Sequence, residues 1–397
     1  MKRFRVLIRS HPVRYDLISA IILKKYLESK QVDVFLTNGS NHRRVVKFWR
    51  PHVAVLDTGS KIRETKSICS TTKIILLQNK ESDRFCLELP TIETLTLISK
   101  IVLWGQKSYE CCIEKFGERI KEKLCIIGAP KLDIAKHLSG INKPGKKNTI
   151  GIIGNFYNVN QHALRPVIWS CRSEDNIHRT LKQIIQFNLI YKLTQRLIKE
   201  TNFRISIRPH PYESLLGYEF IEREFRNRLE IYKSMDICEW MNKQCVLIIL
   251  NKQNLIESNI LKIPYINLTE EECHYNLETE NKNLGIGKHG DQIIEGVIKR
   301  FKLHDFKFGN MYHGKMYQEY NMSAIGKSTA RVGKLIIKVL HEIDHIGYFV
   351  PLTAVNTYAY LKSFYEGYRR PLYRDYNYNP ILHNYPEYID DFVKTLA

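Results

Sequence analysis

One short stretch of this chain combines residue types and spacing that could do chemistry. The apolar run Phe203–Arg208 ends in the sequence Arg-Pro-His-Pro, and Glu213 follows shortly after. Proline favours extended backbone in the residue before it, so the pattern predicts a strand that stops here. Arg208 and His210 would then lie at the carboxyl end of a strand, where open α/β sheets bind ligands. A guanidinium pairs with phosphate or carboxylate, so the stretch predicts an anion site. A rigid turn with an exposed histidine is the alternative.

A second candidate site follows the apolar run Val246–Leu250. Gln253 and Asn254 lie where a short helix is expected to begin, and a helix start favours phosphate through its backbone N–H groups and its dipole. Glu257, one turn further on, could accept hydrogen bonds from ribose hydroxyls. Together with the Arg-Pro-His-Pro strand this predicts a nucleotide pocket, although a simple helix cap would look the same.

Alternating strand and helix patterns indicate the elements that position these residues. Such alternation is typical of βαβ units and parallel sheets. The first series of expected strands is Phe4–Arg9, Val32–Leu36, Val53–Leu56, Ile74–Leu77, Ile101–Leu103 and Leu124–Ile127. The second series is Thr149–Ile153, Phe203–Arg208, Leu229–Tyr232, Val246–Leu250 and Tyr265–Leu268. Helices are expected at Tyr15–Leu27, Leu181–Lys199 and Gly326–Leu340.

A polar, turn-forming stretch, His137–Asn148, divides the two series and is interpreted as a linker. We therefore expect an α/β protein with a first Rossmann-like domain at 1–140 and a second at 149–330. A helical, tyrosine-rich segment at 331–397 would follow. In two-domain folds of this kind, C-terminal helices often pack back on the first domain, and we expect the same here.

The composition indicates which cellular compartment to expect and which kinds of site to exclude. The chain has 397 residues and nine cysteines without CxxC spacing, which argues against a disulfide framework or a zinc site. It contains no apolar run near the ~18 residues that a membrane span needs, and the apolar run that follows its basic start is too short for the core of a signal peptide. We expect a cytoplasmic protein with reduced thiols.

The net charge of +20 favours a polyanionic partner. One expected partner is an anionic membrane surface on the cytoplasmic side, contacted by the basic residues of the tyrosine-rich tail and by Arg43, Arg44, Lys47 and Arg50. The alternative for these last four residues is that they simply solvate a helix. Most of the tail tyrosines are expected to pack against the first domain. Nucleic acid would also fit the charge, but no helix-turn-helix, zinc-finger or RNP-like pattern is present, so we do not expect it as a partner.

Several motifs, in order along the chain, resemble one protein family. They are Trp104-Gly105, Gly128–Asp133 (Gly-Asn-Pro-Arg-x-Asp in the family), Arg208–Pro211 with Glu213, Gln253–Pro264 and Gly326–Val332. The chain thereby resembles the bacterial surface carbohydrate biosynthesis proteins, which include retaining Kdo transferases that use CMP-Kdo. It is more distantly similar to the CDP-glycerol glycerophosphotransferases. Ala129, Lys131 and the pair Gln253-Asn254 depart from the family pattern, which affects the donor's identity more than the fold.

The resemblance implies a GT-B fold, with two Rossmann-like domains facing each other across a cleft. The nucleotide-sugar donor would bind the second domain, and a glycan or glycolipid acceptor mainly the first. The expected activity is metal-independent and cofactor-free transfer of Kdo or a related acidic sugar from CMP to a surface polysaccharide or a lipid-linked acceptor. Lys327 and Ser328, which lack P-loop spacing, are further candidates for the donor phosphate.

The resemblance also directs attention to carboxylates, because transfer with retention needs a carboxylate nucleophile or internal return, and inversion needs a base. In the family, the carboxylate lies between the segment at Asn155 and the long helix. Asp175 is the first choice and Glu174 the second, with helix capping as the alternative. Asp16 is a third candidate, on the acceptor side.

The remaining acceptor-side candidates are His11, Arg14, Asn155 and Lys131. The first two follow the first strand, where they could hold or deprotonate an acceptor hydroxyl. Three other functions stay open: polyol-phosphate transfer from CDP-glycerol or CDP-ribitol, nucleic-acid binding, and a non-catalytic assembly role.

Overall fold

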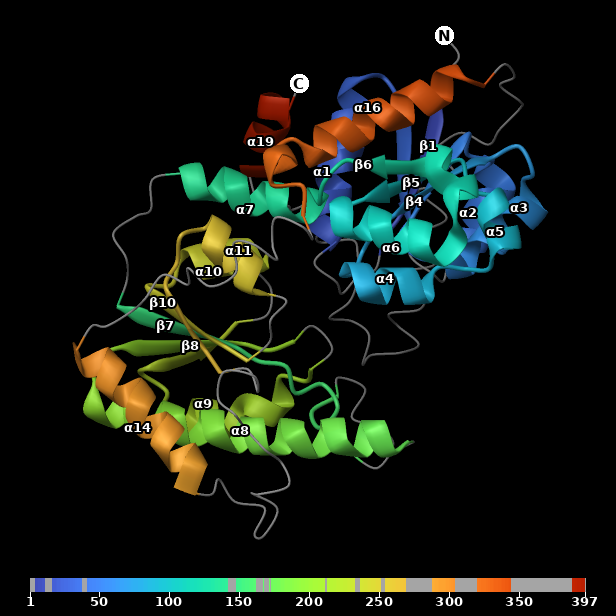
Figure 1. Ribbon diagram of the computed structural model, residues 1–397. Coiled ribbons are helices and arrows are strands. Elements are labelled where there is room, and N and C mark those ends of the chain that lie inside the picture. The colour runs from blue at the N-terminus through green and yellow to red at the C-terminus, as the bar shows by residue number, and fades with distance from the viewer. Residues whose placement is uncertain are drawn as a thin grey trace. The chain divides into compact units, whose positions relative to one another are not determined.

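The computed structural model describes residues 4–10, 16–37, 41–141, 148–161, 167, 171, 173–210, 213–232, 236–250, 254–268, 288–303, 320–343 and 388–396. The chain forms two compact units. Unit 1 combines Met1–His137 with Tyr312–Ala397, and unit 2 is Leu138–Met311. Each unit contains one parallel sheet (Figure 1).

The sheet of unit 1 has six parallel strands in the order β2-β1-β3-β4-β5-β6. Its strands are β1 (Arg5–Arg9), β2 (Asp33–Thr37), β3 (Val53–Leu56), β4 (Lys73–Leu77), β5 (Lys100–Leu103) and β6 (Leu124–Ile126). Its helices are α1 (Asp16–Ser29), α2 (His42–Trp49), α3 (Ile62–Ile68), α4 (Ser82–Glu88), α5 (Ile92–Thr96), α6 (Gln106–Phe116), α7 (Pro130–Gly140), α16 (Ser328–His341) and α19 (Tyr388–Leu396). Short 3-10 turns lie at Gly59–Lys61, Glu118–Lys123 and Met322–Ala324.

The strands of unit 1 are apolar on both faces, as a sheet covered by helices on both sides requires. One face presents Leu7, Leu56, Leu76 and Leu103 to a core that includes Trp49 of α2. This core continues into α3 to α6, so the helices between β2 and β6 bury one face of the sheet.

The C-terminal helices belong to unit 1. Helix α16 packs on α1 at Gly333, where an added Cβ would lie 2.3 Å from the Tyr26 ring. Helix α19 also packs on α1, with an ion pair between Lys25 and Asp390. The expected return of the C-terminal helices to the first domain is confirmed.

Two expected boundaries differ from the structure. The expected linker starts at His137, but α7 continues to Gly140, because this segment carries the apolar residues of a helix and Leu138 is buried. The expected end of the second domain at 330 falls inside unit 1, since residues 320–343 pack there. Residues 142–147 lie outside the described part of the chain.

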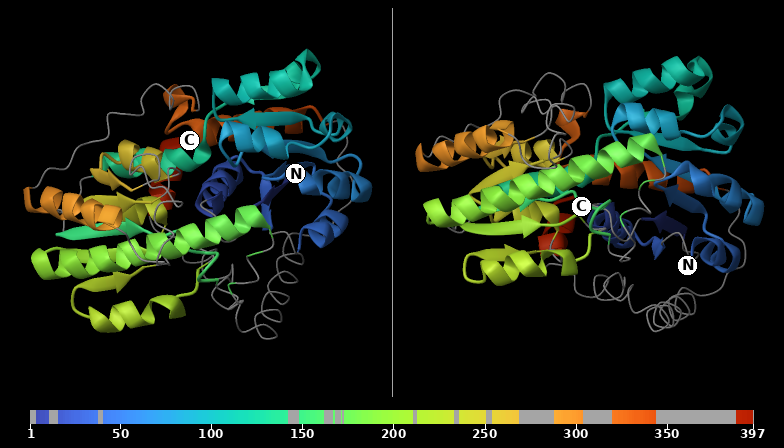
Figure 2. Two further views of the ribbon diagram at one scale, coloured as in Figure 1. Left: turned by 60° about the horizontal axis from the view of Figure 1, so that its bottom comes forward. Right: turned by 90° about the horizontal axis from the view of Figure 1, so that it is seen from below.

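The sheet of unit 2 has five parallel strands in the order β11-β10-β7-β8-β9. Helices α8 and α14 lie side by side on one face of this sheet, and α10 and α11 on the other (Figures 1 and 2). The strands are β7 (Thr149–Ile153), β8 (Arg204–Arg208), β9 (Leu229–Ile231), β10 (Val246–Ile249) and β11 (Tyr265–Asn267). The helices are α8 (Glu174–Glu200), α9 (Glu219–Glu224), α10 (Ile237–Asn242), α11 (Leu255–Ile260) and α14 (Lys288–Leu303), and a 3-10 turn covers Leu216–Tyr218.

Each strand expected from the sequence is present, with ends that differ by a residue or so. The three expected helices are present too, and the helix expected at Leu181–Lys199 begins earlier, at Glu174. In each unit the chain winds from a central strand in one direction and then in the other. The order therefore reverses between β1 and β3 in unit 1, and between β7 and β10 in unit 2. Ligands of open α/β sheets bind outside the carboxyl ends of strands at such a reversal.

None of the helices in the described part of the chain is both long enough and apolar enough to cross a bilayer.

Candidate functional site

The carboxyl end of β8 carries the Arg-Pro-His-Pro motif. Arg208 is 8% exposed, and its carbonyl oxygen accepts a hydrogen bond from Gly154 N at 2.9 Å, which ties the end of β8 to the end of β7. The guanidinium also interacts electrostatically with Asp236. Burial raises the pKa of Asp236, and the positive charge of Arg208 partly offsets that rise. Arg208 thus places a buried positive charge beneath this edge of the sheet.

Glu213 organises the loops around this edge. Its side chain is fully buried, and Oε1 accepts hydrogen bonds from Phe156 N and His210 N, each at 2.8 Å. Its other oxygen accepts a hydrogen bond from the Tyr218 hydroxyl. Burial and the nearby carboxylate raise the pKa of Tyr218 well above its usual value. Glu213 therefore fixes the loop after β7 against the loop after β8, and these bonds use both of its carboxylate oxygens within the protein.

His210 lies beside an aromatic residue that sequence reasoning did not single out. The rings of His210 and Tyr157 are 5.2 Å apart between centroids and tilted by 37°. Tyr157 is 36% exposed, whereas its neighbour Phe156 is fully buried. Asn155, a predicted site residue, is half-buried in the same loop. The available signal for Tyr157 was an aromatic residue in the asparagine-containing loop that follows a predicted strand.

The second predicted element lies at the end of β10, on the other side of β7 from β8. Asn254 is the N-cap residue of α11 and makes no side-chain capping bond, and Gln253 lies outside the described residues. Asn254 is 5% and Glu257 6% exposed, so both side chains are buried at this edge. The ends of β8, β7 and β10 are thus neighbours on one edge of unit 2, at its reversal of strand order.

The predicted phosphate ligands Lys327 and Ser328 lie in unit 1, at the start of α16. Backbone N–H groups of Gly326, Ser328 and Thr329 donate to the carboxylate of Asp133, at 2.7, 3.3 and 2.7 Å. Ser328 is fully buried, and its hydroxyl donates to the Ala324 carbonyl at 3.0 Å. A protein carboxylate therefore fills the helix start that was expected to face a phosphate.

The predicted nucleophiles Asp175 and Glu174 lie in the first turn of α8, and both are exposed. Ser173 is the N-cap, and its hydroxyl accepts a hydrogen bond from Asn176 N at 3.3 Å. Glu174 lies 3.9 Å from His178 in an exposed pair. The capping alternative therefore applies to Ser173, which leaves the Asp175 carboxylate without a capping function.

On unit 1, the predicted acceptor residue Lys131 lies against aromatic rings. Its ammonium is 4.5 Å from the Trp104 ring centroid, and the Trp104 ring stacks on Tyr320 at 5.3 Å. Gln78 accepts a hydrogen bond from Trp104 N at 2.7 Å, which joins the ends of β4 and β5. His11 and Arg14 lie outside the described residues, and Asp16 begins α1 with a side chain that is not described.

An ion pair that the sequence did not reveal lies at the same edge. Arg9, at the end of β1, donates to the carboxylate of Asp57, which follows β3. Their side chains are 12% and 9% exposed. Arg9, Asp57 and Lys131 line a cavity of about 50 Å³, together with Gln78 and Trp104. This cavity lies at the reversal of strand order of unit 1.

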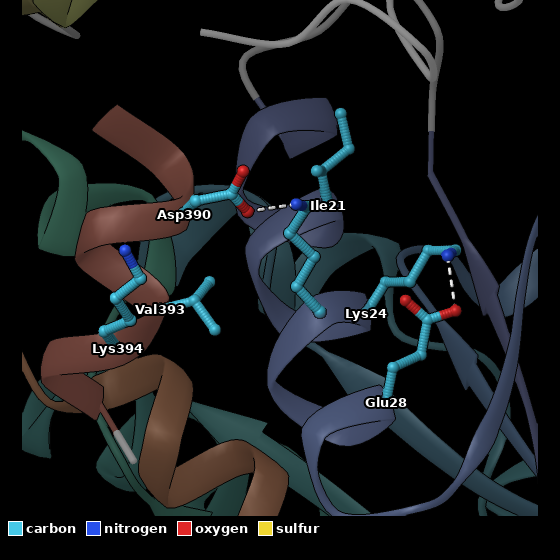
Figure 3. A pocket seen from close by; sticks show the side chains of 7 residues that line it. Ile21, Lys24, Glu28, Asp390, Val393 and Lys394 are labelled. Atoms are coloured by element: carbon cyan, nitrogen blue, oxygen red, sulfur yellow. Dashed lines mark hydrogen bonds and ion pairs between the residues drawn. The ribbon is translucent and has the colours of Figure 1, made fainter. Parts of the chain in front are cut away.

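A larger cavity, of about 530 Å³, lies between α1 and α19 and contains none of the predicted site residues (Figure 3). Three lysines border it, and carboxylates lie beside them: Lys24 pairs with Glu28, and Lys25 with Asp390. This larger cavity is therefore a space between two helices that is lined by ion-paired side chains. Within the described residues, no cluster of three or more His, Cys, Asp or Glu could hold a metal ion.

No family model and no curated protein matches this chain. Solved structures do match. The S. aureus MnaA–UDP complex has a TM-score of 0.51 and 12% identity, over 88% of this chain and 100% of its own. A proposed UDP-N-acetylglucosamine 2-epimerase from Listeria monocytogenes has a TM-score of 0.53 and 10% identity, over 88% of this chain and 100% of its own. The H444N variant of the wall teichoic acid polymerase TagF has a TM-score of 0.53 and 14% identity, over 86% of this chain and 90% of its own. These proteins have the GT-B fold, and the likeness shows that this chain has that fold as well.

Proposed function

We propose that the protein is a GT-B transferase that takes an activated group from a nucleotide donor bound to unit 2 and serves surface glycan synthesis. The observation that carries the proposal is the edge of unit 2. There, Glu213 holds the His210 loop against the loop of Tyr157, at the end of the strand that carries the buried Arg208. This edge lies at the reversal of strand order, where α/β sheets bind ligands.

The chemistry assigned to this edge is electrostatic. The Arg208 guanidinium and the His210 imidazole stabilise the negative charge of the departing nucleotide phosphate, and such preorganised groups cost little reorganisation during the reaction. The exposed ring of Tyr157 offers a stacking surface for the base. Asp175 is the carboxylate assigned to the reacting centre, Glu174 the second choice, and Asp16 the candidate on the acceptor side.

The proposed donor is CMP-Kdo or a related acidic CMP-sugar, and the alternative is CDP-glycerol or CDP-ribitol. The likeness to a teichoic acid polymerase is the observation that favours the alternative. To separate them, the protein is incubated with CMP-Kdo, CDP-glycerol and UDP-N-acetylglucosamine, and nucleotide release and epimerised sugar are measured. CMP release from only one cytidine donor decides between the two. Turnover or tight binding of the uridine donor alone contradicts the cytidine assignment.

The site assignment is tested by His210→Ala and Glu257→Gln. His210→Ala should lower donor turnover at least 100-fold, because transition-state charge stabilisation of this kind contributes about 10²–10³ in rate. Glu257→Gln should instead weaken donor binding about tenfold or more, because it replaces a charged acceptor for the ribose hydroxyls. His341→Ala is the matched control, since His341 is an exposed histidine at the end of α16 in unit 1 and should leave turnover unchanged. Thermal unfolding of each variant checks the fold. Full activity in both site variants would remove this edge from the mechanism.

A membrane partner is proposed for helix α2 of unit 1. Arg43, Arg44 and Lys47 are exposed on the face opposite its buried residues, and Phe48 is 52% exposed beside them. The helix carries no acidic residue, so its outer face combines positive charge with one apolar ring. This chemistry fits the interface of an anionic bilayer.

Sedimentation with phosphatidylglycerol vesicles measures this contact. Arg43→Glu with Lys47→Glu should reduce vesicle binding strongly, because each charge near an anionic surface contributes about 1 kcal/mol. Lys299→Glu with Arg300→Glu makes the same charge change on exposed positions of α14 and serves as the control. Equal losses in both double variants would argue against a surface on α2.

A further inference from the structure

The small cavity of unit 1 has mostly apolar walls. It lies at the carboxyl edge of the sheet, next to the reversal of strand order between β1 and β3. Its volume of about 50 Å³ exceeds the roughly 10–15 Å³ that one water needs. It is far smaller than the roughly 300–1,000 Å³ of pockets that enclose whole ligands. The cavity therefore suits a substituent rather than a whole sugar ring. Its apolar lining residues are Ile8, Ala20, Leu23, Leu77, Val102, Trp104 and Pro130.

Two buried polar atoms at this cavity have unused hydrogen-bonding capacity. Ser19 lines the cavity and is 8% exposed, and no hydrogen-bond partner for its hydroxyl is found in the described part of the chain. The same holds for Nε of Arg9, although Nη1 of this guanidinium donates to Asp57. A buried polar group without a partner costs roughly 1–3 kcal/mol, so two of them at one cavity call for an explanation.

We propose that this cavity binds an acetyl group carried by the carbohydrate acceptor. The methyl group packs against the apolar walls, and the carbonyl oxygen accepts hydrogen bonds from the Ser19 hydroxyl and from Nε–H of Arg9. An acetyl group is neutral, small and apolar at one end, and its single acceptor atom suits two donors. The proposal rests on the proposed function, because it makes unit 1 the acceptor side of the transferase.

Other occupants fit less well. A phosphate or carboxylate would bring a negative charge close to Asp57, whose carboxylate already pairs with Arg9, and would set that charge against mostly apolar walls with Lys131 as the second cation of the lining. A hydroxymethyl group would satisfy the donors but would set a polar group against apolar walls. Ordered water is the remaining rival, and it predicts no preference among sugars.

The test measures binding of free sugars by NMR titration without nucleotide. N-acetylglucosamine, N-acetylgalactosamine and N-acetylmannosamine are each compared with the parent hexose. At least one N-acetyl sugar should bind several-fold more tightly than its parent. Ser19→Ala should weaken the binding of that N-acetyl sugar about two- to tenfold, which corresponds to the loss of one hydrogen bond. The binding of the parent hexose should not change. Ser29→Ala is the matched control, because its hydroxyl donates to the Tyr26 carbonyl at 2.7 Å on the same helix, away from the cavity.

A second variant tests the cavity itself. Ala20→Val adds two methyl groups at a buried wall position and should abolish the preference for the acetylated sugar. Thermal unfolding verifies that each variant is folded. The proposal is overturned if no N-acetyl sugar binds saturably, if parent and acetylated sugars bind equally, or if the preference survives in both variants. Because no donor is present, a failed donor assay on unit 2 counts against the proposed function and not against this result.

Discussion

Asp133 in the first turn of α7 accepts a hydrogen bond from the backbone N–H of Thr329 at 2.7 Å, across 196 positions of sequence. It also accepts from Gly326 N, and so satisfies backbone donors at the start of α16 that the helix itself leaves unpaired. Close approach supports this arrangement: an added Cβ at Gly128 would lie 2.5 Å from Ser328 Oγ. The motif at 128–133 therefore attaches the late helix to the first unit.

The first prediction concerns this attachment. Asp133→Ala leaves several buried N–H groups without an acceptor, so the free energy of unfolding should fall by about 3 kcal/mol. Urea denaturation measures the loss. Asp391→Ala is the control, because Asp391 is exposed on α19 and pairs with the exposed Lys394. Equal stability of the two variants would show that the cap contributes nothing.

A pH dependence follows from the same residue. Burial raises the pKa of Asp133, although the N–H groups partly oppose the rise. The folded state therefore holds the proton more tightly than the unfolded chain. Stability from this group is fully present below the unfolded pKa of about 3.8 and is lost as the pH rises through the folded pKa. Asp133→Asn does not titrate, so the stability of wild type relative to this variant should decrease over that rise. A difference that stays constant or increases with pH contradicts the sign.

Glu213 gives a third prediction. Glu213→Ala removes the acceptor for Phe156 N, His210 N and the Tyr218 hydroxyl, and should cost about 3 kcal/mol of unfolding free energy. Tyr218→Phe removes one of these bonds and should cost about 1 kcal/mol. Glu219→Ala, at an exposed position nearby, should change stability little. Chemical denaturation of the three variants orders them, and any other order argues against Glu213 as the organiser of the loops.

A fourth prediction compares two helix glycines. An added Cβ at Gly333 would clash with Tyr26, whereas at Gly296 of α14 it meets no atom within 4 Å. Gly333→Ala should therefore destabilise the protein by about 1–3 kcal/mol. Gly296→Ala should stabilise it by up to about 1 kcal/mol, because alanine is the better helix former. Thermal melts of both variants give the signs, and stabilisation by Gly333→Ala would contradict the packing of α16 on α1.

Two neighbouring residues at the start of α8 have different proposed roles, one in capping the helix and the other in catalysis. Ser173→Ala removes the N-cap and should lower stability by about 0.5–2 kcal/mol with little effect on donor turnover. Asp175→Asn should leave stability nearly unchanged but abolish turnover if the assignment of the nucleophile holds. Urea midpoints and CMP release are measured on both variants. An active Asp175→Asn variant would transfer the assignment to Glu174 or Asp16.

The strands could be predicted from the sequence because each is a short apolar run bounded by turn residues, a pattern that depends on local chemistry. The edge at His210 could be predicted for a similar reason, because two prolines end a strand at a place where a ligand site is expected. The sequence made Ser328 a candidate ligand for a donor phosphate, whereas in the structure the carboxylate of Asp133 accepts the N–H groups at this helix start. A helix start has the same local sequence whether a ligand or a distant carboxylate satisfies it.

The sequence by itself determined the alternation of strands and helices, the two series and the end of β8, because these depend on neighbours in the chain. Only the tertiary structure decided which residues meet across long separations. It joined Arg9 to Asp57, placed Tyr157 beside His210, and set the Asp133 carboxylate at the start of α16. Such pairings depend on strand order and on burial, and buried polar groups must find partners wherever the fold supplies them.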